Sequence, residues 1–526
     1  MNSIRLLESG ALDILAGNFY FCFTDNKPFH YSKNQIVNTV VGNITLTDSQ
    51  QRALNSVIAF LCDSSQKVFV LKGYAGTGKT TLVRAILSEI IRKNLPYLLL
   101  ASTGRAAKVL SDAIRSLSGE TPMFASASTI HSLIYTFSSI SQDLDLFSQT
   151  EEPKEIASDK GIKLLFSLKK KEQNTSTSTI YLVDEASMIS DAKDCSLSQA
   201  QYGTEGKLLH DLMEYDPQGK FIFIGDACQL PPVNQSISPA LSTTYLKEVF
   251  HIEAKECELT EIVRQSDGND IPISAARMRD LYFNPPTGRI AWFPFRGYSN
   301  IHILNNEYEL LNHYISSIKN HDYNHATMIV LSNKSVMSLS NIIRPAIGFG
   351  SKSVSEGDLL LITQNNLISG LMNGDLVRVV GLGMRENRCG LTFTFVQVES
   401  LANGNKYSQL LLEDILYSGQ TNLNAEQQTH LMIDFHIRMR EKGPKQNSPE
   451  YVDRMRNDSY LNALRCVFGY ALTCYKSQGG EWDKVYLVVP RGLPYNEPRS
   501  YAYQWVYTAM TRAKTDLYVI DDYWVK

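Results

Sequence analysis

Short runs of apolar residues alternate along the chain with stretches in which apolar residues recur every three or four positions. The runs at residues 68–71, 97–101, 180–183 and 221–224 have the length and composition of buried strands. The stretches between them have the period of amphipathic helices, and Thr47 stands where it can cap the helix before the first run. Strands that alternate with helices predict an α/β fold built on a doubly wound parallel sheet.

The same alternation returns in the second half of the chain and predicts a second α/β lobe. Its strand-like runs are at residues 327–331, 468–473, 486–489 and 517–520. Residues 355–412 differ, because short alternating runs are separated there by turn dipeptides such as Asn373-Gly374, which predicts a small all-β insertion. Residues 426–456 are polar and charged, and we expect a helical excursion.

These patterns divide the 526 residues into two lobes with insertions. Residues 1–43 are expected to form an N-terminal appendage. Residues 44–258 form the first lobe, with a hairpin-type insertion at about 135–178. Residues 259–345 and 465–526 form the second lobe, and residues 346–464 form the β-rich insertion with its charged helical excursion.

Composition excludes several classes of protein. The hydrophobic content of 43% and the charged content of 20% are ordinary for a soluble globular protein. The net charge of −3 gives no global basic field, so nucleic acid could bind only in a local groove. The eight cysteines form no C-x-x-C pair, and no run of 18 apolar residues occurs. Glu8 and Asp13 interrupt the apolar stretch at the N-terminus, so we do not expect it to act as a signal peptide. We therefore expect a cytoplasmic protein without a zinc site or a disulfide framework.

The first apolar run leads into a motif for phosphate binding. Gly73, Gly78, Lys79 and Thr80 fill the pattern G-x-x-x-x-G-K-[ST]. In such a loop the backbone N–H groups surround a phosphate, the lysine reaches the β- and γ-phosphates, and the threonine hydroxyl ligates Mg²⁺. The strand before and the helix after favour an ATP site over a glycine-rich turn without a ligand. The remaining loop residues expected to contact the nucleotide are Gly76, Thr77 and Thr81.

Polar residues at the ends of later strands extend this site. Asp184 and Glu185 follow the third run, where Asp184 would join the Mg²⁺ shell and Glu185 would orient and deprotonate the attacking water. The fourth run ends in Gly225-Asp226, which places Gln229 near the γ-phosphate. Arg264 and Arg512 could be surface arginines, but a second lobe that faces the nucleotide would make them arginine fingers.

Taken in order, these segments resemble the motifs of superfamily-1 DNA helicases of the RecD/Dda type, the 5′→3′ subgroup, over about residues 45–520. The matching segments are Leu46-Thr47-x-x-Gln50, residues 73–80, Ser102-Thr103-Gly104-Arg105-Ala106-Ala107, Thr129-Ile130-His131, Asp184-Glu185, Gly225-Asp226-x-x-Gln229-Leu230-Pro231, Leu259-Thr260-x-x-x-Arg264, residues 470–481 and residues 507–513.

The resemblance implies two RecA-like P-loop NTPase lobes that clamp ATP with Mg²⁺ while single-stranded DNA crosses both lobes. By motif position, Gln50 would read the adenine, and Gly480 and Glu481 would lie on the ribose or phosphate side. The candidate nucleic-acid contacts are Thr103, Arg105, Thr129, His131, Asn333, Lys334, Thr473 and Tyr475. The chain departs from the family pattern at Tyr475, where histidine is frequent, and at Trp482, where phenylalanine is frequent.

The insertion in the first lobe occupies the position where helicases of this family carry a β-hairpin wedge. Its best strand candidate is residues 164–168, and Phe166 is our candidate for the side chain that meets the duplex fork. Phe166 could instead pack the hairpin onto the first lobe.

The sequence thus favours a helicase that hydrolyses ATP and acts on single-stranded DNA and duplex junctions. Two alternatives stay open at this point. One is a translocase specialised for RNA or for displacing proteins from DNA. The other is an ATP-gated nucleic-acid-binding component of a repair or defence assembly.

Overall fold

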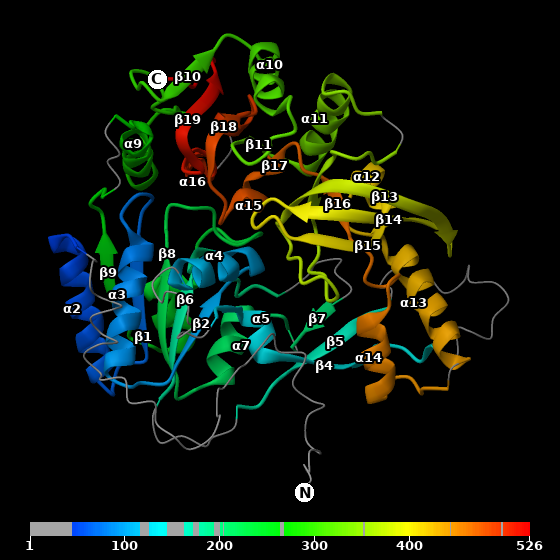
Figure 1. Cartoon of the computed structure of the whole chain (residues 1–526). Coiled ribbons are helices and arrows are strands. Elements are labelled where there is room, and N and C mark those ends of the chain that lie inside the picture. Colours follow the sequence, from blue (N-terminus) through cyan, green and yellow to red (C-terminus); the bar gives the residue numbers. More distant parts are fainter. Residues whose placement is uncertain are drawn as a thin grey trace, which may run out of the picture.

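The computed structural model of the protein describes residues 45–115, 126–144, 162–171, 178–193, 200–203, 205–263, 268–350, 353–441, 443–495 and 498–526. Two α/β lobes, a β-rich unit and a pair of helices make up this part of the chain (Figure 1). The predicted appendage at residues 1–43 and the candidate finger Arg264 lie outside the described residues. No described helix is long and apolar enough to cross a membrane.

The first lobe is a parallel six-stranded sheet in the order β3-β2-β6-β8-β1-β9. Its strands are β1 (Val68–Gly73), β2 (Tyr97–Ala101), β3 (Ser128–Thr129), β6 (Ile180–Asp184), β8 (Lys220–Gly225) and β9 (Lys255–Leu259). Its helices are α2 (Asp48–Cys62), α3 (Lys79–Arg92), α4 (Gly104–Arg115), α5 (Ile130–Ile134), α7 (Leu208–Tyr215) and α8 (Thr243–Phe250). Helices cover both faces of the sheet, which explains why the central strands are continuously apolar.

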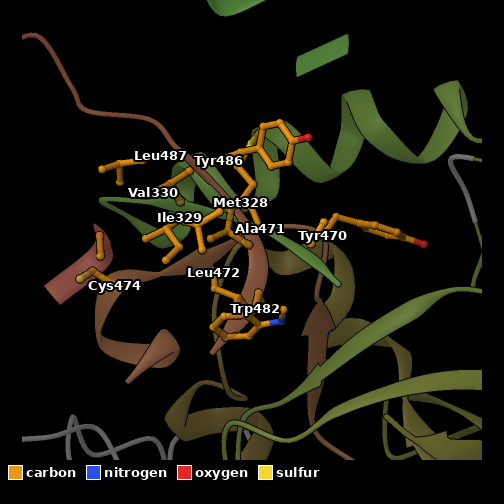
Figure 2. Close-up of a cluster of buried hydrophobic side chains, with 14 of the residues drawn as sticks. Met328, Ile329, Val330, Tyr470, Ala471, Leu472, Cys474, Trp482, Tyr486 and Leu487 are labelled. Carbon is orange, nitrogen blue, oxygen red and sulfur yellow. The ribbon is translucent and has the colours of Figure 1, made fainter. Parts of the chain in front are cut away.

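The second lobe repeats this design with a parallel five-stranded sheet in the order β10-β19-β18-β11-β17. Its strands are β10 (Ile301–Leu304), β11 (Ala326–Val330), β17 (Leu472–Thr473), β18 (Trp482–Leu487) and β19 (Ala513–Ile520). Its helices are α9 (Ile271–Phe283), α10 (Glu307–Ile318), α11 (Asn333–Ala346), α15 (Cys474–Ser477) and α16 (Arg499–Met510). Figure 2 shows part of its core, which includes Ile329 of β11, Leu472 of β17 and Trp482 of β18.

An antiparallel sheet in the order β15-β14-β13-β12-β16 forms the predicted all-β insertion. Its elements are β12 (Leu359–Ile362), β13 (Leu376–Arg388), β14 (Leu391–Ser400), β15 (Lys406–Leu412), β16 (Cys466–Phe468) and the helix α12 (Glu413–Ser418). One boundary differs from the prediction. Strand β16 pairs with β12, so residues 466–468 belong to this sheet and not to the second lobe. A run of three apolar residues carries no signal that distinguishes the two sheets.

The hairpin predicted in the first lobe is present. Strands β4 (Tyr135–Ile140) and β5 (Leu164–Leu168) pair in antiparallel fashion, with Phe137 opposite Phe166. A third strand, β7 (Ala200–Tyr202), adds to β5 in parallel and lies beyond the limit of 178 that we predicted. Its three residues are too few to show a period, so the sequence pattern missed it.

The charged excursion of the second lobe is helical, as predicted, and it packs against this hairpin. Helices α13 (Ala425–Arg440) and α14 (Pro449–Asn457) contribute Phe435 and Tyr451 to a buried cluster with Ile140 and Leu144 of the hairpin region. The backbone N–H of Ile140 donates to Asn447 Oδ1 at 3.1 Å. The two lobes therefore contact each other here as well as at the interface between their two α/β sheets, which we call the seam (Figure 1).

Candidate active site and nucleic-acid interface

The phosphate-binding loop connects β1 to α3 and depends on its glycines. Gly76 and Gly78 have φ angles of 78° and 75°, in the left-handed region that glycine adopts without strain. A Cβ at Gly73 would lie 2.6 Å from Lys79 Cγ, so a larger residue there would displace the lysine. Lys79 Nζ donates to the carbonyl of Gly73 at 2.7 Å, which holds the ammonium group over the loop. The loop and the N-terminus of α3 have the conformation that the motif predicted, and this conformation suits an anion.

Gln50 supports this loop from the first helix. Its Nε2 donates to the carbonyl of Thr77 at 3.1 Å, and its Oε1 accepts from the backbone N–H of Thr47 at 3.0 Å. Thr47 Oγ1 in turn accepts from the backbone N–H of Gln50, which completes a capping box and confirms Thr47 as the N-cap. Gln50 is only 2% exposed, and its bond to the Thr77 carbonyl connects α2 directly to the phosphate loop. Contact between Gln50 and the adenine stays a prediction.

The acidic residues stand at the ends of β8, which lies beside β1, and of β6, which lies beside β8. Because β6, β8 and β1 are successive parallel strands, Asp184, Asp226 and the phosphate loop all lie at the carboxyl ends of these strands. Burial, reinforced by the charge of Glu185, raises the pKa of Asp184, and Lys79 opposes this shift. Burial also raises the pKa of Asp226. Both shifts indicate carboxylates held in a low-dielectric site that favours a cation.

Glu185 has an unusual backbone conformation. Its φ of 49° lies in the left-handed region, where residues with a side chain are uncommon and strained. The hydroxyl of Ser102 donates to the carbonyl of Glu185 at 3.0 Å, and the backbone N–H of Glu185 donates to Asp184 Oδ1 at 2.9 Å. These bonds hold the strand end in a turn. Backbone strain of this kind clusters at functional sites, which supports a catalytic position for this carboxylate.

The side chains at the carboxyl ends of these strands fit a nucleotide with Mg²⁺. The described residues contain no group of three or more His, Cys, Asp or Glu side chains that could hold a metal alone. Mg²⁺ usually takes one or two protein oxygens and completes its shell with phosphate oxygens and water, which suits Asp184 and Thr80. Gln229 adds a second observation, because its buried Oε1 has no hydrogen-bond partner within the described residues. A water or phosphate-bound group would satisfy that oxygen.

The second lobe brings an arginine to the seam between the lobes. Arg512 is 6% exposed, and its Nη1 donates to the carbonyl of Gly480 at 3.2 Å. Burial lowers the pKa of Arg105; Asp375 opposes the shift, and the charge of Arg512 adds to it. The two guanidinium groups are therefore close enough for their charges to interact at the junction between the lobes. Glu481, the neighbour of Gly480, is exposed.

Helix α16 binds the first lobe through one face. Gln504 Nε2 donates to the carbonyl of Gln229 at 3.3 Å, and Thr508 Oγ1 accepts from the backbone N–H of Leu230 at 2.8 Å. Between them the hydroxyl of Tyr507 contacts both the phosphate loop and Asp226. Sequence reasoning assigned no role to Tyr507, although it lies inside the matching segment 507–513.

Four of the nucleic-acid candidates lie at or just after the carboxyl ends of the two outermost strands on one side of each sheet. Thr103 follows β2 and Thr129 ends β3, and these two strands form one edge of the first sheet. Asn333, exposed in the first turn of α11, follows β11, and Thr473 ends the neighbouring strand β17 at an edge of the second sheet. Lys334 is exposed beside Asn333. Helix N-termini such as those of α4 and α11 suit phosphate groups.

The other three candidates have partners within the protein. The ring of His131 lies 4.9 Å from that of Tyr202, and Tyr475 packs against the core of the second lobe. Burial raises the pKa of Tyr475 to about 12. Arg105 Nη1 donates to the carbonyl of Gly374 at 3.3 Å. A motif position says where a residue stands along the chain but not which way its side chain points, so DNA contact by these residues stays a prediction.

Lys476 is a residue that sequence reasoning left unassigned. Its Nζ is buried and has no hydrogen-bond partner within the described residues, and burial lowers its pKa to about 8. The signal was available, because Lys476 lies between Tyr475 and Ser477 in the matching segment 470–481.

Comparisons with known proteins agree with this geometry. A family model described as an AAA domain matches residues 45–280, and a model of the UvrD-like helicase C-terminal domain matches residues 468–520. The ATP-dependent DNA helicase Dda of Enterobacteria phage T4 is 24% identical over 502 residues, which cover 90% of this chain and 99% of Dda. An uncharacterised protein of Acanthamoeba polyphaga mimivirus is 24% identical over 532 residues, which cover 89% of this chain and 98% of that protein.

Among solved structures, Pif1 helicase from Bacteroides in complex with ADP-AlF3 and single-stranded DNA aligns with a TM-score of 0.45 and 16% identity. The alignment covers 91% of this chain and 93% of that chain. The two matched models fall on the two lobes, at the phosphate loop and at the segment that carries Arg512. Together with the similarity to Dda along nearly its whole length, these matches support a superfamily-1 helicase of the Dda and RecD type.

Proposed function

We propose that this protein is an ATP-dependent DNA helicase that moves 5′→3′ along single-stranded DNA and separates the strands of a duplex. The observation that carries the proposal is the seam between the lobes, where α16 binds the loop after β8 and the phosphate loop. A nucleotide bound at this seam would change how the two lobes meet. The T4 relative is named an ATP-dependent DNA helicase.

Each residue of the nucleotide site has a distinct role in the proposed reaction. Thr80 and Asp184 would hold Mg²⁺, which when bound supplies positive charge to the phosphate oxygens. Glu185 would accept the proton of the attacking water, and Gln229 would orient that water through its unpaired Oε1. Lys79 and Arg512 would stabilise the charge that develops on the phosphate in the transition state.

Movement along DNA would follow from closure of the lobes. Thr103 and Thr129 stand on the first lobe, and Asn333 and Thr473 stand on the second, so closure would shift one set relative to the other. A strand held alternately by the two sets would pass in one direction. We propose single-stranded DNA and duplex junctions as the partners, and the cytoplasm as the location.

The test is to measure ATP hydrolysis with and without single-stranded DNA or RNA, and unwinding of duplexes with a 5′ or a 3′ tail. Lys79→Ala serves as the inactive control, because the ammonium group acts on the phosphates. DNA-stimulated hydrolysis with unwinding of the 5′-tailed duplex supports the proposal. Unwinding of the 3′-tailed duplex alone contradicts the direction, and stimulation by RNA alone favours an RNA translocase. ATP binding without stimulation by either nucleic acid favours an ATP-gated binding component.

A further inference from the structure

One side chain of the second lobe holds two separate parts of the nucleotide site in the first. Tyr507, on α16, is 2% exposed. Its hydroxyl donates to Asp226 Oδ2 at 2.8 Å and accepts from the backbone N–H of Ala75 at 2.9 Å. Ala75 lies in the phosphate loop, and Asp226 follows the neighbouring strand β8. A single hydroxyl therefore bridges the two strand ends across the seam.

Among the described residues, no other side chain donates to Asp226 Oδ2 or accepts from the backbone N–H of Ala75. Asp226 is 0% exposed, and its other oxygen, Oδ1, accepts from the backbone N–H of Cys228 at 2.9 Å. Loss of the hydroxyl would leave a buried carboxylate oxygen and a loop N–H without the bonds they make here, which is costly in a low-dielectric site. Burial, followed by the charge of Asp226, raises the pKa of Tyr507 far above its usual range, so the hydroxyl keeps the proton it donates.

The bridge is one member of a row. Gln504 and Thr508 lie on the same face of α16, three residues before Tyr507 and one after it, and they bind Gln229 and Leu230. The row thus contacts the loop after β8 at several points. Only Tyr507 also reaches the phosphate loop among the described contacts of this face.

We propose that the Tyr507 hydroxyl is a positioning group through which closure of the second lobe sets the geometry of the phosphate loop and of Asp226. When the lobes close, the hydroxyl orders both strand ends. When the lobes part, both partners lose it together. This inference rests on the proposed ATP-driven cycle and adds a coupling residue that acts without touching the nucleotide. Turnover then depends on lobe closure through two residues of one segment, Tyr507 and Arg512.

The test compares Tyr507→Phe with Tyr503→Phe in the full chain. Phenylalanine keeps the buried ring and removes only the hydroxyl. Tyr503 is a matched control because it is fully buried on the same helix and packs edge-on against Phe293 of the second lobe, with 6.1 Å between ring centroids. For Tyr507→Phe we expect kcat with single-stranded DNA to fall about tenfold or more, as when a buried bond to a charged group is lost, with a KM for ATP within about twofold.

Several outcomes would overturn the inference. They are a wild-type kcat for Tyr507→Phe, an equal loss in both variants, or a change in KM alone. A melting temperature that falls more for Tyr507→Phe than for Tyr503→Phe, with an unchanged kcat, would assign the hydroxyl a structural role only. If the wild-type protein shows no DNA stimulation, the proposed function fails. The same comparison of kcat is then made on hydrolysis without nucleic acid.

A second measurement separates the bridge from a general effect of the hydroxyl. In an Asp226→Ala background one of the two partners is already absent. Loss of the Tyr507 hydroxyl should then reduce kcat by a smaller factor than in the wild-type background. Equal factors in both backgrounds would mean that the bond to Asp226 does not carry the effect, and would contradict the proposal.

Discussion

The guanidinium group of Arg105 lies over the indole ring of Trp482, with 5.2 Å between Cζ and the ring centroid. Arg105 lies in the first turn of α4 in the first lobe, and Trp482 is the first residue of β18 in the second lobe. The same guanidinium donates to the carbonyl of Gly374 in the β-rich insertion. Arg105 thus connects three parts of the chain at a position where we expected a contact to DNA.

We expect Arg105→Ala to act on the joint between the lobes. A cation over an indole ring contributes about 0.5–2 kcal/mol, so the melting temperature should fall by a few degrees. The dependence of DNA affinity on salt should stay as in the wild type, because the group is engaged within the protein. A phosphate contact by Arg105 would instead reduce the slope of log K against log salt by about 0.7, which a fluorescence titration at several salt concentrations would detect.

Glu185→Gln should preserve binding of ATP and DNA and lower kcat by about 10²–10⁴-fold, because the carboxylate acts on water and not on ground-state ATP. The strained backbone of Glu185 at the end of β6 motivates this expectation. Steady-state hydrolysis and binding of a fluorescent nucleotide measure the two effects separately. Glu248→Gln, an exposed change on α8 of the same lobe, is the control. Turnover near that of the wild type would remove Glu185 from the role of base.

Arg512→Ala should bind ATP with modestly changed affinity and hydrolyse it about 10³-fold more slowly, since an arginine finger acts chiefly on transition-state charge. The buried guanidinium beside Gly480 motivates this prediction. Arg491→Ala is the control, because Arg491 is an exposed arginine of the second lobe that pairs with Asp522. If binding and turnover both persist in Arg512→Ala, the finger assignment is wrong.

The two-lobed fold could be predicted because its strands are continuously apolar and its motifs follow strand ends. Parallel sheets buried on both faces require such runs, and β1, β6 and β8 have them. The hairpin strand at residues 164–168 was predicted with the bounds it has. Strands β7 and β16 were not placed, because three residues carry no period and their partners lie far away in sequence.

The site could be predicted in part for a related reason. Gly73, Lys79 and the strand-end acids act through backbone conformation and position, which a motif specifies. Tyr507 and Arg105 act through contacts between lobes, and such contacts depend on how the lobes pack. Local sequence does not encode that packing, so the bridge of Tyr507 and the joint at Trp482 appear only in the structure.

Lys476→Met should stabilise the protein at neutral pH. Burial lowers the pKa of Lys476 to about 8, whereas lysine in an unfolded chain titrates near 10.4. Below pH 8 the folded state carries the full cost of a buried charge, and between about pH 8 and 10 the unfolded state binds more protons, so stability rises with pH. Removing the charge should raise the free energy of unfolding at pH 7 by on the order of 1–3 kcal/mol.

Urea denaturation at pH 7 and pH 9.5 tests this expectation. The gain from Lys476→Met should shrink at the higher pH, since the wild-type lysine is then largely neutral. Lys319→Met, at an exposed position after α10, should change stability little at either pH. A loss of stability in Lys476→Met at pH 7 would mean that the ammonium group has a favourable partner.

The last prediction concerns the hairpin residue Phe166. Its ring lies 5.0 Å from that of Tyr202 and 5.7 Å from that of Phe137, and it packs beside the core of the first lobe. The ring is half-buried, so it contributes to packing and also keeps a surface that a base could meet. Stacking on an aromatic ring is worth about 1–3 kcal/mol per base, comparable with about 1.4 kcal/mol for a DNA stacking step. A fork role is therefore energetically adequate and stays a prediction.

Two substitutions separate packing from a fork role. Phe166→Ala should keep DNA-stimulated hydrolysis and translocation on single strands but slow the unwinding of a tailed duplex. Phe166→Leu keeps apolar volume and loses the ring, so it should unwind as slowly as Phe166→Ala while its melting temperature stays near that of the wild type. Ser167→Ala, at an exposed position on the other face of β5, is the control. If Phe166→Leu unwinds at the wild-type rate per ATP and only Phe166→Ala is impaired and less stable, Phe166 packs the hairpin and another residue meets the fork.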